Sequence, residues 1–360
     1  MSLLTKADPS MTGQAGYLML DGLRRPWVER FILFKGRTIP RVATVLGRAD
    51  RWGALKARWG FGRSRYSVLP GLYAAGAPDG RSPVFVSANY KMSFDALRSS
   101  LKGLDAWILV LDTRGVNVWC AAGKGSFGTD ELVSRMRSTR LDAIVEHRGL
   151  VLPQLGATGV AAQEVARRTG FRVEWGPVRA SDIPAWLAAG KVKDEAMRTV
   201  SFALRDRLAV TPIELVHAWP LLLASLALGA IHGLPAGGGW LARAFSAALL
   251  LLGAIVAGTL LFPALLPWLP SRAFVVKGAF LGAAWALAWG LIFSVPALAW
   301  VAGILVAAPV SGFLAMNFTG STTFTCQPGA LWEVEKSFWP LVSSELAGIA
   351  LAIGARLLGR

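Results

Sequence analysis

The pattern of hydrophobic and polar residues divides the chain into two parts. Up to Arg207 charged residues are frequent, and short apolar runs alternate with stretches that have helical periodicity. Beyond Arg207 the charges nearly vanish, and residues 278–332 contain none. Two physical environments therefore share one chain, with water around the first part and lipid around the second.

In the first part, predicted strands alternate with predicted helices. Short apolar runs indicate buried strands at residues 84–86, 106–111, 143–145, 150–152 and 171–175. Apolar residues at helical spacing, or capping residues, predict helices at 94–104, from Thr129, at 160–168 and at 182–190. This alternation is typical of a parallel sheet with helices on its faces. We therefore expect a Rossmann-like α/β domain over residues 81–190, preceded by an arm and loops over residues 1–80.

The second part predicts an all-α transmembrane domain over residues 215–360. About five apolar stretches are each long enough to cross about 30 Å of hydrocarbon. They lie at residues 215–231, 244–266, 275–293, 297–316 and 338–358. A basic linker, residues 191–214, precedes them, and its cations are expected near anionic headgroups: Lys191, Lys193, Arg198, Arg205 and Arg207.

The N-terminus has no basic start followed by an apolar core, so it does not read as a secretory signal. We expect a multi-pass protein of the cytoplasmic (inner) membrane, with the α/β domain in the cytoplasm. The inter-span basic residues Arg272, Lys277 and Lys336 would then return to the cytoplasmic side, as the positive-inside rule requires.

Composition agrees with a membrane protein. The chain is 54% hydrophobic and only 17% charged, which excludes an ordinary soluble globular protein. The formal net charge of +16 raises the possibility of nucleic acid, but no zinc-finger, recognition-helix or RNA-binding signature accompanies it. We therefore expect membrane lipid, and no nucleic acid, as the partner of the basic residues.

Four segments follow the predicted strands and would meet at one edge of the sheet, where such folds bind ligands. They are residues 87–90, 115–124, 153–159 and 176–178, all rich in Gly, Pro, Asn or small residues. Small residues let backbone approach a ligand closely, although ordinary loops have the same composition. The second segment contains Cys120, which is either a small buried hydrophobe or a ligand. With Cys326 as the only other cysteine, the chain has no disulfide framework.

The string Asn117-Val118-Trp119-Cys120-Ala121-Ala122-Gly123-Lys124, followed by residues 125–132, resembles the signature of the HgcA family of mercury-methylating corrinoid proteins. Residues 87–91, 152–157 and 171–184 are similar to the corrinoid-binding domain of the related corrinoid iron–sulfur protein large subunit. The likeness also reaches residues 317–323.

This resemblance implies a corrinoid (cobalamin-type) cofactor at the sheet edge, with Cys120 as the catalytic residue and lower axial ligand of cobalt. It implies that the following residues bind the cofactor: Ser87, Asn89, Asn117, Val118, Trp119, Cys120, Ala121, Ala122, Gly123, Lys124, Gln154, Leu155, Gly156, Gly176 and Pro177. Trp119 could shield a corrin face or only pack, and Asn117 could bind a ring amide or only begin a helix. Lys124 is expected to be solvated.

The activity implied is transfer of a methyl group from cobalt to inorganic Hg(II), giving methylmercury. Its partners would be a methyl-folate-dependent methyl donor and a small ferredoxin with [4Fe-4S] clusters, since two cysteines cannot hold a cluster that needs four. Two alternatives remain open: a corrinoid methyl carrier of the acetyl-CoA pathway type, and a corrinoid-binding membrane sensor or transporter. Cys326 could relay mercury, could meet the cofactor, or could have no special role. Glu345, an acid within a predicted span, faces the bundle, snorkels to the interface or has a function.

Overall fold

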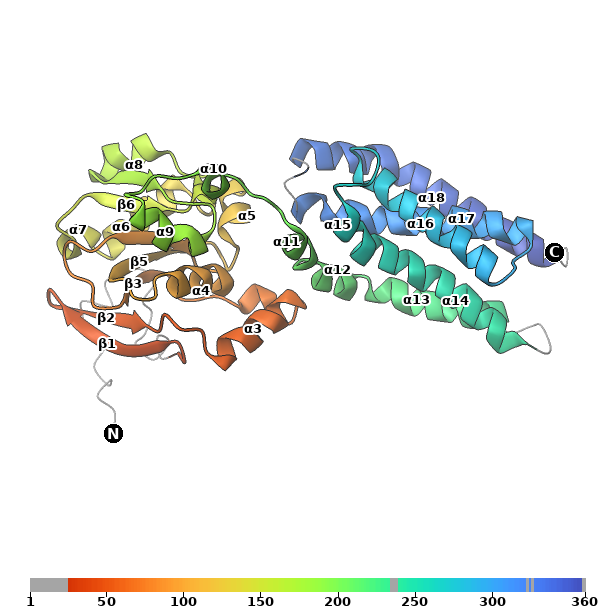
Figure 1. Cartoon of the computed structure of the whole chain (residues 1–360), viewed down its shortest axis with the longest axis horizontal. Coiled ribbons are helices and arrows are strands. Elements are labelled where there is room, and N and C mark those ends of the chain that lie inside the picture. Colours follow the sequence, from red (N-terminus) through yellow and green to blue (C-terminus); the bar gives the residue numbers. More distant parts are fainter. Residues whose placement is uncertain (1–24, 234–238, 322–323, 325–326, 358–360) are drawn as a thin grey trace. The chain divides into compact units, whose positions relative to one another are not determined.

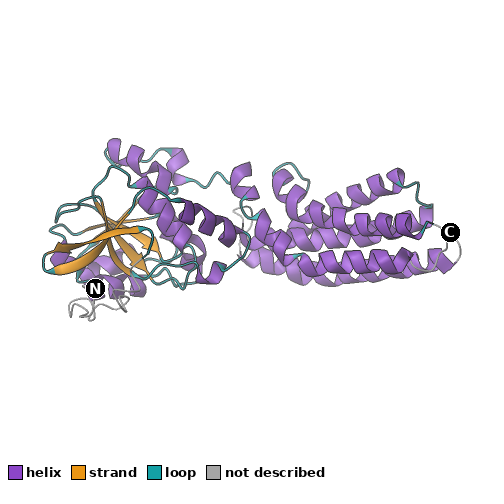
Figure 2. Ribbon diagram, turned by 90° about the horizontal axis from the view of Figure 1, so that it is seen from below, coloured by secondary structure: helices purple, strands orange, loops and turns teal. Residues whose placement is uncertain are grey.

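The computed structural model describes residues 25–233, 239–321, 324 and 327–357. The chain forms two compact units: one contains the residues up to Ala57 together with Phe61–Ser201, and the other Arg58–Gly60 with Phe202–Arg360. The first unit is built around a β-sheet, and the second consists of helices (Figures 1 and 2). The division of the sequence into an α/β part and an all-α part is therefore visible in the structure.

The sheet of the first unit has seven strands in the order β1-β2-β3-β5-β4-β6-β7. The strands are β1 (Val28–Phe34), β2 (Arg37–Val42), β3 (Gly71–Ala75), β4 (Val84–Ala88), β5 (Ala106–Leu111), β6 (Gly149–Leu152) and β7 (Arg172–Trp175). Strands β5, β4, β6 and β7 run parallel, whereas β3 pairs antiparallel with β5 and β1 forms a hairpin with β2. The first of the four parallel strands thus lies between the second and the third, which is a doubly wound order.

Helices cover both faces of the sheet. Side chains alternate along β5, so that Leu109 packs in the core on one face and Ile108 in the core on the other. The first core also contains residues of α5 (Val118–Gly123), α6 (Thr129–Ser138), α7 (Leu141–Ile144) and α8 (Ala162–Thr169). The second contains residues of α4 (Lys91–Ser100) and α9 (Ile183–Ala188). A short helix, α10 (Glu195–Arg198), and the 3₁₀ turns η1 (Arg63–Arg65), η2 (Gln154–Gly156) and η3 (Ala180–Asp182) complete the unit.

In residues 84–111 and 149–190 the structure has strands and helices in the order that the sequence predicted, with bounds that differ by a few residues. Two other predictions are wrong. Residues 1–80 do not form only an arm and loops, because β1, β2, α3 (Arg48–Arg58) and β3 lie within them; residues 1–24 lie outside the described part. Strand β3 is wholly buried between β2 and β5, and its Gly and Ala residues lack the alternation that identifies a strand. Residues 143–145, predicted as a strand, largely belong to α7, since a short buried apolar run has the same composition in either structure.

A buried ionic network joins α3 to α4. Asp50 accepts from Lys91 Nζ (Oδ1, 2.8 Å) and pairs with Arg98 Nη2 (Oδ2, 2.8 Å). Asp95, one turn from each cation on α4, lies 2.5 Å from Lys91 Nζ and 2.7 Å from Arg98 Nε. The Lys91 ammonium also lies 5.4 Å from the ring centroid of Trp27. Because these charges are out of water, α3 cannot leave α4 without exposing unpaired charges to an apolar environment.

In the second unit, four helical segments of the described residues are long and apolar enough to cross a membrane: residues 240–265, 274–292, 297–317 and 328–355. They comprise α14 (Trp240–Val256), the π-helical turn η4 (Ala257–Leu261), α15 (Phe262–Leu265), α16 (Phe274–Ile292), α17 (Ala297–Asn317) and α18 (Gln327–Leu357). A fifth span would require the bent pair 204–217 and 219–231, with an angle of 55°. That pair contains α11 (Leu204–Leu208), α12 (Thr211–His217) and α13 (Trp219–Gly233), and η5 (Phe318–Ser321) follows α17.

Small residues let α16 and α17 pack closely. A Cβ added to Gly282 would lie 2.3 Å from the Ala307 carbonyl oxygen, and one added to Gly278 would lie 2.6 Å from the Ser311 carbonyl oxygen. Pro309 interrupts α17, and its missing N–H leaves the Leu305 carbonyl without its usual partner. Ser344 of α18 donates its hydroxyl to that carbonyl at 3.0 Å, so a side chain replaces the lost backbone bond.

Two cations bind the last carbonyls of α15 and its continuation. Arg207 donates to the oxygens of Pro263 (3.1 Å) and Ala264 (2.9 Å), and Lys277 donates to that of Leu266 (2.7 Å). Arg207 was expected near lipid headgroups, but its side chain is buried in the protein. The last carbonyls of a helix have no donor within the helix, and Arg207 supplies donors to two of them. Glu345 lies within α18, as predicted, and Cys326 lies outside the described residues.

The ionic network predicts a pH-dependent stability. Burial raises the pKa of the Asp50 carboxyl, but hydrogen bonds from Lys91, Arg98 and the Gly47 N–H outweigh it, and the pKa lies below its ordinary value. This stabilisation is complete above the unfolded-state pKa of about 4 and is lost as the pH falls through the lower folded-state value. At neutral pH, Asp50→Asn should lower stability by about 3 kcal/mol. Thermal unfolding can be followed by near-ultraviolet circular dichroism. The difference in stability between Asp50→Asn and the wild type should become smaller as the pH is lowered, and a difference that does not change with pH would contradict this account.

The Pro309 site predicts a conditional role for Ser344. With Pro309 present, Ser344→Ala should lower the free energy of unfolding by about 1 kcal/mol, because the Leu305 carbonyl loses its donor in an apolar environment. In a Pro309→Ala background the restored N–H should make the same substitution nearly neutral. The two costs can be compared in a double-mutant cycle of unfolding in detergent micelles. Equal costs in both backgrounds would show that Ser344 does not replace the missing backbone bond.

Candidate functional site

The pairing register places the carboxyl ends of the four parallel strands at one edge. Ala88 at the end of β4 lies opposite Leu111 at the end of β5, and Leu152 of β6 lies opposite Trp175 of β7. The chain leaves β4 to form β5 on one side and later returns to form β6 on the other. In doubly wound sheets a crevice opens where the connections diverge in this way, which here is between β4 and β6.

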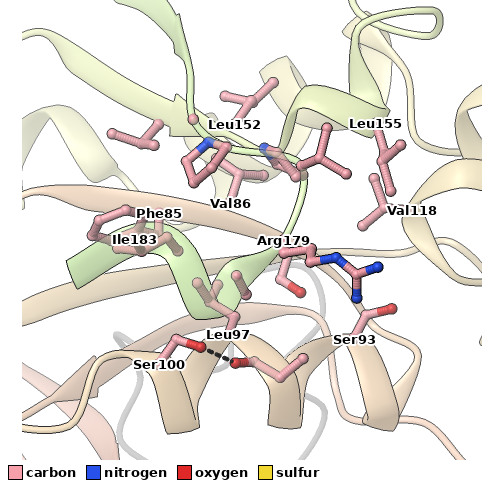
Figure 3. A pocket seen from close by; sticks show the side chains of 18 of the residues that line it. Phe85, Val86, Ser93, Leu97, Ser100, Val118, Leu152, Leu155, Arg179 and Ile183 are labelled. Atoms are coloured by element: carbon pink, nitrogen blue, oxygen red, sulfur yellow. Dashed lines mark hydrogen bonds between the residues drawn. The ribbon is translucent and has the colours of Figure 1, made fainter. Parts of the chain in front are cut away.

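A cavity of about 590 Å³ lies at that point of the sheet. It is lined from β4 and β6, from α4 and η3, and from the start of α5, and Figure 3 shows a view into it. Phe85 and Ile183 lie at one end, and Arg179 lies beside Ser93 towards the other, where Val118 and Leu155 also line the cavity. Among the described lining residues only Arg179 is charged, so the cavity suits a largely apolar group that carries polar or anionic substituents.

Cys120 lies beside this cavity on α5, but it does not line it. Asn117, the N-cap of α5, accepts the Cys120 backbone N–H through Oδ1 at 2.9 Å. Ala121 and Ala122 anchor the helix in the hydrophobic core, whereas Trp119, Gly123 and Lys124 are exposed. The free, partly buried thiol of Cys120 is therefore on a helix whose small residues face inward and whose other face is open.

Asn89 fixes the loop that leads from β5 to α5. Its Oδ1 accepts the Thr113 hydroxyl (2.8 Å), the Thr113 N–H (3.1 Å) and the Gly115 N–H (2.9 Å), while Nδ2 donates to Asp112 Oδ1 (3.2 Å). Ser87, one strand position from the loop, is buried and lines the cavity. Asn89 thus positions the chain that precedes Cys120, and its polar atoms are already engaged.

The glycines of the site have two different roles. A Cβ on Gly156 would lie 2.6 Å from the Phe127 ring, so this glycine lets the turn after β6 pack against the loop after α5. A Cβ on Gly123 or Gly125 would meet nothing within 4 Å, and Gly125 has a φ of +79° that favours glycine. Only these two leave open space next to Cys120, where a planar group could approach.

Lys193 was not recognised as part of the site from the sequence. It was expected near lipid headgroups, but its Nζ donates to Gln154 Oε1 (2.5 Å) and more weakly to the Gly176 carbonyl (3.4 Å), across the ends of β6 and β7. Burial, followed by the positive charge of Arg198, lowers the pKa of the Lys193 ammonium. Spacing along the chain could not reveal this contact, because Lys193 is 39 residues from Gln154. Lys191 likewise pairs with Glu174 at 2.5 Å.

The structure brings part of the predicted residue set to the cavity. Seven line it: Ser87, Asn117, Val118, Trp119, Leu155, Gly176 and Pro177. Eight do not: Asn89, Cys120, Ala121, Ala122, Gly123, Lys124, Gln154 and Gly156. Of these eight, Ala121 and Ala122 are core residues and Gly156 packs against Phe127. Arg179, Ser93 and Leu97 line the cavity without having been predicted, since α4 and η3 follow their strands with no signature of their own.

Within the described residues, no group of three or more His, Cys, Asp or Glu side chains could hold a metal ion. The described residues therefore do not form a site that would bind a metal ion through several protein ligands. A single thiol beside an open helix face and a cavity is compatible with a metal that arrives inside its own macrocycle.

The comparisons with known proteins cover this same region. The family described as CO dehydrogenase/acetyl-CoA synthase delta subunit matches residues 62–187, which include β3 to β7, Cys120 and all the residues that line the cavity. Residues 62–187 are thus similar in sequence to that family. The match supports the corrinoid cofactor that the sequence resemblance implies.

Curated relatives include gamma subunits of the acetyl-CoA decarbonylase/synthase complex. Those of Methanopyrus kandleri and Archaeoglobus fulgidus are each 33% identical over 127 residues, and that of Methanosarcina acetivorans is 29% identical over 129 residues. Each match covers 35% of this chain and 27% of the relative. The chain therefore shares about a quarter of the length of these subunits, and the homologous segment contains the cavity but none of the membrane-length helices.

The N-cap of α5 predicts a change in thiol reactivity. Asn117→Ala removes the acceptor of the Cys120 N–H and should destabilise the first turn of this short helix by about 1 kcal/mol. Fraying should raise the alkylation rate of Cys120 by about fivefold. Asn117→Ser keeps a neutral acceptor oxygen at the N-cap and should stay near the wild-type rate. An unchanged rate in Asn117→Ala, measured by mass spectrometry of the labelled peptide, would contradict the capping role.

Proposed function

We propose that this chain is a membrane-anchored, corrinoid-dependent methyl-transfer protein in which Cys120 is the lower axial ligand of cobalt. The observation that carries the proposal is the position of Cys120, on the open face of α5 and next to the cavity at the switch point of the sheet. The corrinoid, when bound, supplies a cobalt that can accept and donate a methyl group.

The residues around Cys120 suit this cofactor. Gly123 and Gly125 leave room for a flat ring on the outer side of α5, and Trp119 offers an exposed aromatic face beside it. The neighbouring cavity would receive groups that project from the ring, and Arg179, which donates to the Ser201 hydroxyl, is the charged lining residue that an anionic substituent would meet. Asn117 and Asn89 hold the backbone that presents the thiol.

For the methyl acceptor we propose inorganic Hg(II). A thiolate at position 120 would donate electron density to cobalt and favour departure of the methyl group as a carbanion equivalent towards a soft electrophile. Over a full cycle the methyl group would be taken up as a cation and released as a carbanion equivalent, a difference of two electrons, so an external reductant would be needed. The small [4Fe-4S] ferredoxin and the methyl-folate-dependent donor remain the proposed partners, and the cytoplasmic membrane the proposed location.

A second candidate is a corrinoid methyl carrier for an acceptor of the acetyl-CoA pathway type. The similarity to gamma subunits of the acetyl-CoA decarbonylase/synthase complex favours it. Both candidates share the cofactor and the methyl-transfer chemistry, and they differ in the acceptor.

The test compares wild type, Cys120→Ala and Cys326→Ser after loading of the full chain with a corrinoid. The wild type and Cys326→Ser should share a thiolate-type absorption spectrum that Cys120→Ala lacks. Methyl transfer to Hg(II) in a single turnover should fall about tenfold or more in Cys120→Ala, because an interaction at the metal is lost.

Three other results would change the assignment. Identical spectra in wild type and Cys120→Ala would contradict axial ligation by the thiol. A Cys120-dependent spectrum without methylmercury would favour the carrier over mercury methylation. Failure of the wild type to bind a corrinoid would contradict both candidates.

A further inference from the structure

Helix α3 turns its small residues towards the domain and its large apolar residues towards solvent. On the inner face, Ala57 is buried and a Cβ on Gly53 would lie 2.6 Å from the Tyr66 hydroxyl. On the outer face, Trp52 is 60% exposed and Leu55 is 45% exposed. A surface helix of a globular protein normally has the opposite arrangement, with its apolar face inward. The outer face of α3 therefore lacks the partner that its composition requires.

The exposed apolar residues continue at both ends of the helix. Val45 before α3 is 62% exposed and Phe61 after it is 67% exposed. Single exposed apolar residues are ordinary, but a set along one short helix and its two ends marks an interaction surface. We call Val45, Trp52, Leu55 and Phe61, with the cations around them, the α3 surface.

The positive charges around this face are not balanced by acidic side chains within the described part of the chain. Arg48, Arg51, Lys56 and Arg65 are exposed, and none makes an ion pair with another described residue. Between Glu29 and Asp79 the only acid in the sequence is Asp50, whose carboxylate is held inside the network with Lys91 and Arg98. The α3 surface thus combines exposed aromatic and aliphatic side chains with uncompensated positive charge.

We propose that the α3 surface docks on the anionic lipid surface of the bilayer that the chain's own apolar helices occupy. Helices that lie in a membrane interface have Trp, Phe or Leu on one side and Lys or Arg flanking it, as α3 does. Anionic headgroups attract each nearby cation within a Debye length. The four membrane-length helices in the same chain keep a bilayer close, which raises the effective concentration of lipid for a weak surface contact.

This contact would act on the methyl-transfer site through α4. Asp50 on α3 binds Lys91 and Arg98 on α4, and the same helix contributes Ser93 and Leu97 to the cavity. The ionic network makes the docking helix and one wall of the cavity a single rigid piece. Lipid docking would therefore hold that wall at the membrane surface. The proposal depends on membrane insertion of the second unit and not on the identity of the cofactor.

The test uses the full chain in a Cys120→Ser, Cys326→Ser background, reconstituted into vesicles. An environment-sensitive fluorophore is attached at Leu55→Cys, and at Leu33→Cys as a matched control, since Leu33 on β1 is a leucine that is 76% exposed. Vesicles of phosphatidylcholine with phosphatidylglycerol are compared with phosphatidylcholine alone, and lipids with acyl-chain quenchers report contact with the bilayer.

The label at position 55 should show blue-shifted emission and quenching in the anionic vesicles, and the label at position 33 should show neither. Raised salt, or replacement of Arg48, Arg51 and Lys56 by Gln, should reduce the quenching at position 55. Quenching at 55 no greater than at 33 would overturn the proposal, as would quenching that is the same in neutral vesicles and insensitive to the charges. A blue shift that persists in detergent, without lipid quenching, would show that protein covers the surface instead.

Discussion

The candidate site depends on one constraint, the parallel pairing of β4 with strands on both of its sides. Ala88 aligns with Leu111 of β5, and Phe85 with Val151 of β6, so the carboxyl ends of the three strands lie at the same edge of the sheet. Since the following connections diverge from β4, backbone cannot fill the space beyond it. Helix α5 starts at that edge, and α4 and η3 close the remaining sides. A shift of β4 by one residue would exchange the side chains on its two faces, so that Phe85 and Val86 would each move to the opposite core.

Elsewhere the structure is held by single side chains that satisfy polar groups out of water. Asn89 binds three donors of the loop before α5, and Asp50 pairs with both cations of α4. In the helical unit, Ser344 supplies the donor that Pro309 lacks, and Arg207 binds carbonyls at the end of α15. Each unpaired polar group in such an environment would cost a large fraction of the stability of a domain, so these contacts determine which loops and helix ends are rigid.

Cys120 lies on a helix, α5, that is fixed to the protein on one face and open on the other. Ala121 and Ala122 bind the helix to the core, and Asn117 caps its start, so the helix is anchored on one side and free on the other. A thiol on the free side is available to a ligand while its backbone stays fixed. The segment that matches the CO dehydrogenase/acetyl-CoA synthase delta subunit family, residues 62–187, contains the whole of α5.

The sequence by itself determined the division into an α/β part and a helical part with apolar helices of membrane length, most of the strand-helix alternation from β4 to α9, and the position of Cys120 after β5. These depend on periodicity and on chain order, both of which are local. It did not predict β3, whose Gly and Ala residues are strand only because β2 and β5 pair with them, nor the helix at residues 141–144. It assigned Lys193 and Arg207 to the lipid interface, whereas tertiary structure gave them carbonyl and amide partners 39 and 56 to 57 residues away. Such partners are chosen by which polar groups burial leaves unpaired, and burial exists only once the distant parts of the chain have packed.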